Sequence, residues 1–410
     1  MGNLPTDIPA LRLAVIGAGP CGLALALHAA QALPTAQISL FDSRTLEHDV
    51  GSDPRTLALS LGSVQLLRRL GAWVPASAQP IEQVHVSQAP PTLRHAGFGA
   101  SHEPEVSISA AEQGVESLGA VLGYGQVVAP LQAAWLAAVA KAPARLQTRF
   151  GLPVADIKRT EGGVEVDAGI AERFDLAVVA EGGVFAEQQS KTIRRDYAQN
   201  AWVGTVTLAE DSPPGVAYER FTRNGPLALL PLRPLGQQRR AALVWCMPQN
   251  EDAVAELNDA QRLILLNSLL PAGVGKLQAV GLLKCFALGL NAERSLVDGR
   301  IVKIGNAAQT LHPVAGQGLN LGLRDAFSLV QAIATQSITD PADLDAALRR
   351  VAWLRAPDRW ATIATTDFLA RSFAWRWPGL PAARGLGLAL VQALPPVKRA
   401  LARQMMWGWR

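Results

Sequence analysis

Three glycines near the start of the chain have the spacing of a phosphate-binding turn. Gly17, Gly19 and Gly22 follow the apolar run 11–16 and precede an Ala- and Leu-rich segment, so they join a predicted strand to a predicted helix. Gly17 permits the tight turn, Gly19 lets the backbone approach a pyrophosphate, and Gly22 lets the helix pack closely on the strand. Asp42 ends the next predicted strand, 25 residues after Gly17, where it can accept hydrogen bonds from a ribose. The pattern predicts a dinucleotide site and leaves FAD and NAD(P) both open.

A second glycine-rich loop lies ahead of a helix predicted over residues 319–335. Its residues are His312, Pro313, Val314, Ala315, Gly316, Gln317 and Gly318. Backbone N–H groups at a helix start carry partial positive charge, so this loop can stabilise negative charge on a ligand. A glycine-dense bend between helices, without a ligand, would have the same composition. Composition alone leaves both interpretations open.

The surrounding elements predict an α/β fold. Residues 11–42 form one β-α-β unit, the apolar run 174–180 is a buried strand ending at Glu181-Gly182, and 301–304 is a strand ending at Gly305-Asn306. Residues 184–290 contain alternating and apolar strand patterns, which predict a β-sheet inserted into the nucleotide-binding part. We therefore expect a Rossmann-like nucleotide-binding domain (1–75, 100–183 and 291–367), an α+β substrate domain (76–99 and 184–290) and a C-terminal basic helical tail (368–410).

Composition argues against several other classes of protein. The chain of 410 residues is 49% hydrophobic and 18% charged, so it can bury a large core. Its net charge of +4 gives no support to nucleic-acid binding. The three cysteines form no CxxC pair, so neither a metal site nor a disulfide framework is expected.

The C-terminal tail departs from the rest of the chain in charge. Residues 368–410 contain seven basic and no acidic residues, and they include Trp375, Trp377, Trp407 and Trp409. A basic amphipathic helix with tryptophan is typical of a segment that lies on an anionic membrane surface. A terminal helix packed on the core with a solvated basic side would show the same pattern. Both interpretations stay open from the sequence.

The ordered series of motifs resembles the FAD-dependent ubiquinone-biosynthesis hydroxylases, within the aromatic hydroxylases typified by p-hydroxybenzoate hydroxylase. The most specific match is the ungapped run from His312 to Asp325. Supporting matches cover nearly the whole chain: the amino-terminal glycine turn, Asp53-Pro-Arg55, Tyr197-Ala-Gln199, the strand 225–232, Asp358-Arg359 and Thr366-Asp367.

The resemblance implies FAD as cofactor, with NAD(P)H and O₂ as co-substrates. The residues implied at the cofactor are Gly17, Gly19, Gly22 and Asp42 at its ADP end, Arg55, Gln126 and Asn306 along the ribityl and pyrophosphate portion, Glu181 and Gly182 near both FAD and NAD(P)H, and the loop Pro313, Gly316, Gln317, Gly318, Leu319 and Asn320 against the isoalloxazine. In the implied reaction, NAD(P)H reduces the flavin, O₂ forms a C4a-hydroperoxide on it, and the terminal oxygen is transferred to a phenol ring. His312 and Pro313 are the catalytic candidates, and His312 would either assist phenol deprotonation or fix the loop.

Two positions depart from the family pattern. The family usually has Gly-Asp at Gly305-Asn306, but an asparagine oxygen still accepts hydrogen bonds, so FAD binding should survive. The superfamily has Asp-Gly at Glu181-Gly182, and the longer side chain puts the NAD(P)H contacts in question. The run Gly-Asn-Ala-Ala-Gln-Thr is associated with the branch that acts on 2-polyprenyl-6-methoxyphenol.

The expected function is therefore hydroxylation of a polyprenylated phenol in ubiquinone biosynthesis. Two alternatives are a flavin hydroxylase for another ring position or a soluble aromatic, and a largely structural subunit of a hydroxylase assembly. The expected partners are the polyprenyl phenol, O₂, other ubiquinone-biosynthesis proteins and a peripheral membrane contact, and not nucleic acid. The expected location is the cytoplasm, either free or peripheral at the inner face of the cytoplasmic membrane.

Overall fold

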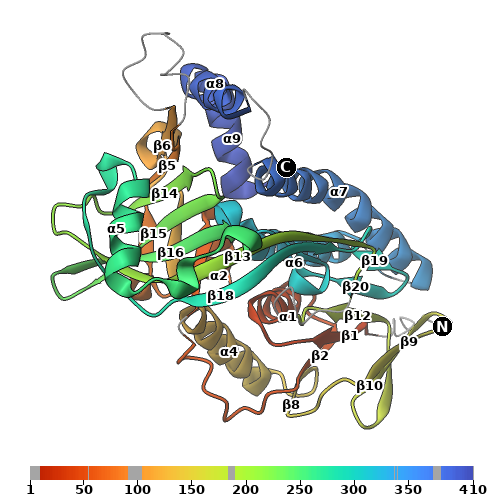
Figure 1. Ribbon diagram of the computed structural model, residues 1–410. Helices are drawn as coiled ribbons and strands as arrows, with labels where there is room; N and C mark the ends of the chain where they lie inside the picture. The colour runs from red at the N-terminus through yellow and green to blue at the C-terminus, as the bar shows by residue number, and fades with distance from the viewer. Residues whose placement is uncertain are drawn as a thin grey trace, which may run out of the picture.

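A mostly parallel sheet carries the amino-terminal glycine turn. The computed structural model describes residues 10–53, 55–90, 104–182, 190–336, 338, 340–372 and 380–409 (Figure 1). Within these ranges the sheet has six strands, in the order β19 (Val297–Asp298), β20 (Ile301–Lys303), β12 (Leu176–Val179), β1 (Arg12–Ile16), β2 (Gln37–Asp42) and β8 (Leu146–Phe150). Strands β2 and β12 flank β1 on opposite sides. The carboxyl ends of β1 and β12 thus form a topological switch point, where open α/β sheets bind their ligands.

The two faces of this sheet are covered differently. The helices packed on one face are α1 (Pro20–Ala32), α4 (Tyr124–Lys141), α6 (Gln317–Ala334) and α7 (Pro341–Ser372). Leu13 and Val15 of β1 point toward these helices and are buried. Ala14 and Ile16 point the other way, toward a small sheet of β9 (Asp156–Thr160), β10 (Gly163–Asp167) and β11 (Ala171–Phe174). Because both faces are buried, β1 is apolar from Leu13 to Ile16 rather than alternating, and the predicted β-α-β unit is confirmed.

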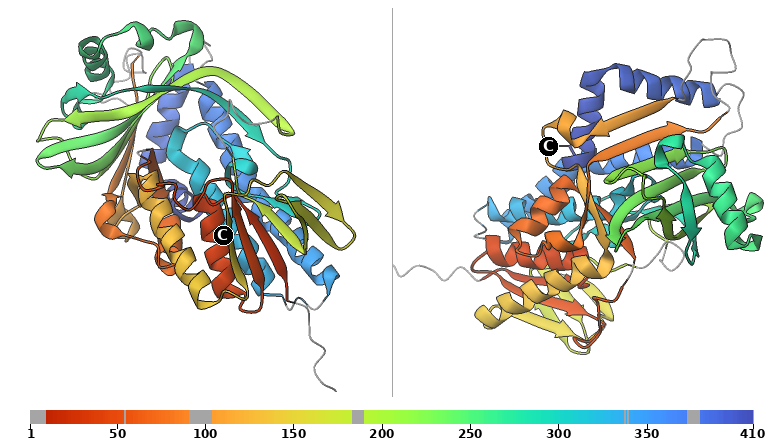
Figure 2. Two further views of the ribbon diagram at one scale, coloured as in Figure 1. Left: turned by 90° about the horizontal axis from the view of Figure 1, so that it is seen from below. Right: turned by 90° about the vertical axis from the view of Figure 1, so that its left-hand side faces the viewer.

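A larger sheet is built mainly from the predicted β-rich region. In the described chain it follows the order β21 (Gln309–Thr310), β18 (Lys284–Ala292), β13 (Ile193–Leu208), β16 (Gln238–Pro248), β15 (Pro226–Leu235), β14 (Val216–Phe221), β5 (Gln83–Gln88) and β6 (Glu105–Ser109), with β17 (Leu277–Val280) paired to β13. Helix α5 (Asp259–Leu269) covers one face, and Figure 2 shows the long green strands of this sheet apart from the red strands of the first. The proposed division into domains stays a prediction, with two differences: β6 and β21 pair here, although the ranges 100–183 and 291–367 were assigned to the nucleotide-binding part.

A second three-stranded sheet joins the two larger ones. It consists of β3 (Thr56–Ser60), β7 (Gly119–Gly123) and β4 (Gln79–Ile81). Helices α2 (Leu61–Arg69) and α3 (Ala110–Gln113) follow β3 and β6 directly. The chain ends in α8 (Leu380–Ala393) and α9 (Pro395–Trp407), at the top of Figure 1. Among the helices that the structure describes, none combines the length and hydrophobicity needed to span a bilayer.

Candidate cofactor and substrate site

At the start of α1, glycine is present at three positions for different structural reasons. Gly17 has a φ of +100°, and a Cβ there would lie 2.7 Å from the backbone nitrogen of Glu181. A Cβ on Gly22 would lie 1.8 Å from the carbonyl oxygen of Gly17, so only glycine lets the helix start here. Gly19 differs, because its Cβ would meet nothing closer than the Tyr124 hydroxyl at 3.5 Å. Apart from its chain neighbours, no atom but this hydroxyl lies within 4 Å of that Cβ, which leaves room for a phosphate at the helix start.

Asp42 ends β2 beside this turn, and its carboxylate is already engaged. One oxygen accepts a 2.6 Å hydrogen bond from the Ala18 amide, and the Arg44 guanidinium donates to both oxygens at 2.8 and 2.9 Å. Burial favours the neutral acid, but these hydrogen bonds outweigh it and hold the pKa of Asp42 below its ordinary value. Asp42 is thus a charged residue that fixes Arg44 and the turn. Sequence reasoning did not identify Arg44 as a residue of this site. The signal that could have found it is a basic residue two positions after Asp42, the acid that ends the strand.

The opposite wall of the crevice comes from the ends of β12 and β20. A Cβ on Gly182 would lie 2.8 Å from the Cβ of Asn306, so the two predicted residues face each other across a close backbone contact. Burial, and to a smaller extent the charge of Asp42, raise the pKa of Glu181. The structure therefore brings Glu181, Gly182 and Asn306 to the same switch point as Gly17 and Asp42. Gly183, which follows Glu181-Gly182 in the sequence, lies outside the described residues.

The start of α6 closes the crevice. Gly316 has a φ of +58° and ends the loop, while a Cβ on Gly318 would have no atom within 4 Å. The first-turn N–H groups of Gln317, Gly318 and Leu319 have no acceptor within their own helix. Gly318 thus faces open space, whereas Gly19 faces one hydroxyl. The starts of α1 and α6 lie close together, because a Cβ on Gly322 of α6 would lie 2.7 Å from the Cys21 sulfur of α1.

Asn320 has a structural role within the same turn. Its Nδ2 donates to the carbonyl oxygens of Ala58 and Gly316, both at 2.9 Å, and its Oδ1 accepts from the Ser60 amide at 2.8 Å and the Ser63 hydroxyl at 2.7 Å. The side chain is 2% exposed. It therefore ties α6 to β3, and only the backbone of Asn320 remains available to a ligand.

Arg55 and Gln126 lie at the rim, near the start of α4. Arg55 forms a 2.7 Å ion pair with Asp53, and its guanidinium lies 4.1 Å from the centre of the Tyr124 ring. The Gln126 Oε1 accepts from the Gly123 amide at 2.9 Å and caps α4, so its amide nitrogen is the group left for a ligand. Burial raises the pKa of Tyr124. The Tyr124 ring contacts the Arg55 guanidinium, and its hydroxyl lies next to Gly19. No sequence motif indicated Tyr124.

His312 is buried and held at both ring nitrogens. Its Nδ1 accepts a 3.2 Å hydrogen bond from the Val314 amide, so the proton is on Nε2, which donates to the Gln199 Oε1 at 3.1 Å. Burial lowers the pKa of His312 to about 4, and the ring is 1% exposed. These contacts favour fixing the loop over taking a proton from a substrate. Pro313 starts the single turn that leads to Gly316, whose amide donates to the Pro313 carbonyl at 3.0 Å.

A bulge in β13 places the partner of His312. The register with β18 shifts between Asp196 and Gln199, and Ala198 has a φ of +51°. β-Bulges redirect side chains next to functional sites. Here Gln199 reaches His312, and the Tyr197 ring packs edge-on against it at 5.6 Å. The large sheet is therefore anchored directly to the loop before α6.

A buried charge network holds α6 in place. Arg355 of α7 donates to Asp325 and Asp358, each at 2.8 Å, and Arg324 of α6 donates to Asp358 at 2.9 Å. The backbone amide of Trp409 also donates to Asp358 at 3.0 Å. Asp358 of the Asp358-Arg359 motif therefore holds three parts of the protein together: α6, α7 and the segment that follows α9.

The C-terminal helices pack on the core with one side. Lys398 forms a 3.1 Å ion pair with Glu112, and the Trp407 indole donates to Gln65 of α2 at 3.3 Å. A Cβ on Gly62 would lie 2.9 Å from the Met406 carbonyl, so α9 presses closely on α2. The core-packing interpretation of the tail is therefore correct for α9. Trp375 and Trp377 lie outside the described residues.

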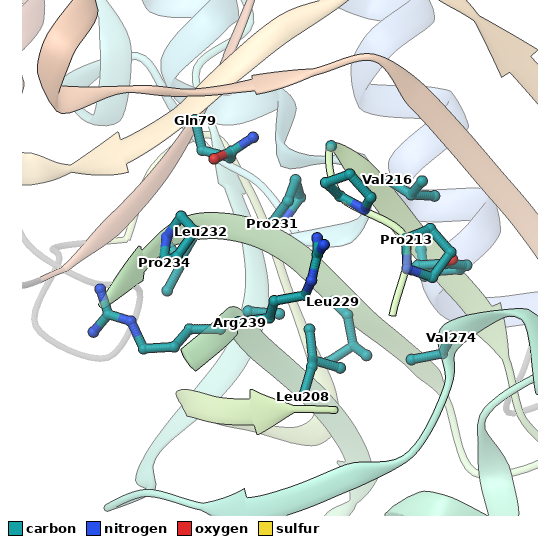
Figure 3. Close-up of a pocket in the computed structure, with 15 residues that line it drawn as sticks. Gln79, Leu208, Pro213, Val216, Leu229, Pro231, Leu232, Pro234, Arg239 and Val274 are labelled. Carbon is teal, nitrogen blue, oxygen red and sulfur yellow. The ribbon is translucent and has the colours of Figure 1, made fainter. Parts of the chain in front are cut away.

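Two cavities in the described protein lie away from the glycine crevice. One, of about 40 Å³, lies in the large sheet among Leu208, Leu229 and Val274 (Figure 3). The other, of about 270 Å³, lies between α2, α6 and the chain end and is lined by Arg69 and Trp407 among others. Neither is lined by a residue predicted to bind the cofactor. Within the described residues, no cluster of three or more His, Cys, Asp or Glu could hold a metal ion.

Fold and crevice together define a class of protein. A Rossmann-like sheet with a glycine turn at its switch point, joined to a mostly antiparallel sheet that is anchored at a second helix start, is the arrangement of an FAD-dependent monooxygenase. A family model described as "FAD binding domain" matches residues 178–347.

Comparison with other proteins identifies the family. The chain is 30% identical over 372 residues to the ubiquinone hydroxylase UbiL of Rhodospirillum rubrum, covering 87% of this chain and 80% of that protein. It is 27% identical to the 3-demethoxyubiquinol 3-hydroxylase of Escherichia coli, covering 97% of this chain and 98% of that protein. A 34% identical match to the uncharacterized protein slr1300 of Synechocystis covers only 49% of this chain and 48% of that protein. The chain belongs to the FAD-dependent ubiquinone-biosynthesis hydroxylases, and it is an aromatic monooxygenase.

Solved structures agree in fold. The p-nitrophenol 4-monooxygenase PnpA of Pseudomonas putida has a TM-score of 0.70 at 15% identity, covering 98% of this chain and 99% of that one. HpxO of Klebsiella pneumoniae, solved with FAD and uric acid, has a TM-score of 0.67 at 16% identity, covering 98% and 99%. At these identities the likeness concerns the fold alone.

Proposed function

We propose that FAD lies in the crevice between the starts of α1 and α6. The observation that carries the proposal is the pair Gly19 and Gly318, each at a helix start. A Cβ on Gly318 would meet nothing within 4 Å, and one on Gly19 would meet only the Tyr124 hydroxyl at 3.5 Å. Gly17 and Gly22 shape the turn at the pyrophosphate, and Asp42 with Arg44 lies at the ADP end. Arg55, Gln126 and Asn306 border the middle of the cofactor, with Glu181 and Gly182 beside it. The residues from Pro313 to Asn320 lie at the flavin ring.

The residues of the crevice suit a flavin monooxygenase. FAD, when bound and reduced by NAD(P)H, supplies the activation of O₂ and the oxygen transfer to an aromatic ring. The first-turn N–H groups of α6 would stabilise negative charge on a flavin ring bound at this helix start, through hydrogen bonds and the helix dipole. His312 keeps this turn in place as a neutral ring bonded to Gln199 and Val314. The protein thus positions and stabilises rather than exchanging protons at His312.

The proposed substrate is a polyprenylated phenol or quinol of ubiquinone biosynthesis. Support comes from the relatives named ubiquinone hydroxylase and 3-demethoxyubiquinol 3-hydroxylase, and from the run Gly305 to Thr310 that is associated with 2-polyprenyl-6-methoxyphenol. Deletion of the gene, followed by mass spectrometry of the accumulated lipid, tests the ring position. Accumulation of a polyprenyl methoxyphenol supports the proposed branch, accumulation of a demethoxyubiquinol favours the other ring position, and unchanged ubiquinone contradicts the proposal.

The outer side of α8 and α9 is the proposed membrane contact. Its exposed apolar residues are Leu386, Leu390, Leu394, Val397 and Leu401, with exposed fractions from 38% to 52%. Arg399 and Arg403 are exposed on the same helix pair. Apolar side chains flanked by arginines suit an anionic bilayer surface, from which a polyprenyl substrate would be drawn. The location proposed is therefore cytoplasmic and peripheral at the inner face of the cytoplasmic membrane, near other ubiquinone-biosynthesis proteins.

Liposome binding tests this contact. Leu390→Asp with Leu394→Asp should abolish co-sedimentation with anionic vesicles, because charged groups replace the centre of the apolar surface. Leu282→Asp is the matched control, since Leu282 is 85% exposed at the turn between β17 and β18. Equal loss in the control, or no loss in the double variant, would reject the membrane contact on α8 and α9.

A further inference from the structure

Glu219 lies on the face of the large sheet that is turned away from α5. Its neighbours on β14 point the opposite way: the Tyr218 hydroxyl donates to the Gly273 carbonyl at 2.8 Å, and Arg220 donates to the Leu269 carbonyl of α5 at 3.1 Å. Because successive side chains of a strand alternate between faces, Glu219 shares its face with Ala217 and Phe221.

This face is the one directed at the loop before α6. Phe221, two residues from Glu219, packs on Val314 of that loop. Gln199 of β13 reaches His312 of the same loop. Ala217, two residues to the other side, belongs to the apolar cluster that includes Ala58, and Ala58 lies against Gly316. Glu219 is therefore flanked along its strand by two residues that pack toward the proposed flavin position.

One oxygen of the Glu219 carboxyl is buried without a partner, although the side chain as a whole is only partly buried. Its Oε1 has no hydrogen bond in the described structure. The residues paired with it on the neighbouring strands are Val86 and Ala228, neither of which has a polar side chain. Burial raises the pKa of Glu219 to about 8, so the group is mainly a neutral acid at neutral pH. Among titratable groups, Cys246 of β16 is close enough for Glu219 to raise its pKa further above the value set by burial.

A buried acid without a partner lowers the stability of the fold, because it has lost its hydration and gained no hydrogen bond. Polar groups left unsatisfied in this way concentrate at binding sites, where the ligand supplies the missing partner. A neutral carboxylic acid can donate one hydrogen bond and accept another. A phenolic hydroxyl, with an adjacent ether oxygen, offers the complementary acceptor and donor.

We propose that Glu219 is the polar anchor of the substrate pocket and hydrogen-bonds an oxygen substituent of the aromatic ring. The assignment rests on the proposed function, since it takes the flavin ring to lie at the start of α6. With apolar neighbours on both sides, Glu219 selects a hydroxylated ring and orients it toward the flavin. It makes this contact directly, and no other described side chain on β14 faces the loop with a polar group.

The test compares stability with substrate affinity in the FAD-loaded enzyme. The variants are Glu219→Gln, Glu219→Leu and, as a control on the same strand but the opposite face, Tyr218→Phe. The probes are 2-methoxy-6-prenylphenol and its methyl ether, titrated by the change in flavin absorbance. Thermal melting and FAD content are measured on each variant.

We expect Glu219→Leu to melt at or above the wild-type temperature, to keep its FAD, and to bind the phenol at least about tenfold more weakly, because it cannot pair with the hydroxyl. The methyl ether should bind wild type and this variant with more nearly equal affinity. Glu219→Gln should lie between them for the phenol. Tyr218→Phe should melt lower and bind the phenol as wild type does.

Two results would overturn the assignment. If Glu219→Leu binds the phenol as tightly as wild type, Glu219 does not contact the substrate. If it melts lower while affinity is unchanged, its role is structural. A wild-type enzyme that holds FAD but does not bind the phenol would refute the proposed substrate class and this inference with it, whereas the first two results refute the inference alone.

Discussion

The state of His312 makes a quantitative prediction about pH. In the folded protein burial lowers its pKa to about 4, from an ordinary value of 6.5. Below the ordinary value the unfolded chain binds a proton that the folded chain does not, so stability is lost as pH falls from about 6.5 toward 4. At about 1.4 kcal/mol for each pH unit between the two values, the full loss from this one residue is about 3 kcal/mol.

The perturbation is His312→Gln, which removes the titration and retains an amide that can bond to Gln199. Between about pH 7 and about pH 4.5, the wild-type free energy of unfolding should fall by about 2.5 kcal/mol more than that of the variant. At neutral pH the variant should be less stable by about 1–3 kcal/mol, because one of two buried hydrogen bonds is lost. The assay is urea unfolding at several pH values, with exposed His48→Gln as the control that keeps the wild-type pH dependence.

Activity separates loop fixing from proton transfer. If His312 only fixes the loop, His312→Gln lowers kcat/KM by a factor that does not change with pH. An equal pH dependence of stability in wild type and variant would refute the buried neutral state. Loss of a limb from the pH–rate profile in the variant would instead restore His312 as a proton acceptor.

Two further predictions concern the start of α6 and its support. Gly318→Ala should leave the apoprotein as stable as wild type, because its Cβ meets open space, but should weaken FAD binding at least about tenfold if a cofactor fills that space. Gly322→Ala is the contrasting variant, since its Cβ would lie 2.7 Å from the Cys21 sulfur and the Gly305 Cα, and it should lose about 1–3 kcal/mol of stability. FAD titration and thermal melting distinguish them, and unchanged FAD affinity in Gly318→Ala would contradict the cofactor placement. Asp358→Asn should destabilise by about 3–5 kcal/mol in urea unfolding, because Arg324 loses its buried counterion and Arg355 keeps only Asp325, and a loss below about 1 kcal/mol would show that the network is not needed.

The local sequence pattern was enough to predict the glycine turn and the strand and helix that flank it. The apolar run before Gly17, the glycine spacing and Asp42 predicted strand, turn, helix and strand, because each depends on residues adjacent in the chain. The helix after the second loop was predicted to start at 319 and begins at Gln317. Helix boundaries differ by this amount when no side chain caps the first turn.

Contacts between distant segments could not be predicted in the same way. No local pattern indicated that Gln199 would meet His312, 113 residues away, or that the Asn320 side chain would bond to β3, α2 and the residue before α6. It also left the tail undecided, because an amphipathic helix fits a membrane and a protein core equally well. Alternation along β14 places Glu219 on one face, but which face meets the loop depends on how the two sheets pack.

The measurement that tests the central claim most directly is isotope transfer from O₂. Purified FAD-loaded enzyme is supplied with 2-methoxy-6-prenylphenol, NAD(P)H and ¹⁸O₂, and the product is analysed by mass spectrometry. The proposed function predicts one ¹⁸O in a hydroxylated ring, formed in step with NAD(P)H consumption. Protein that is colourless and binds no FAD, or a product whose new oxygen comes from water, would contradict it.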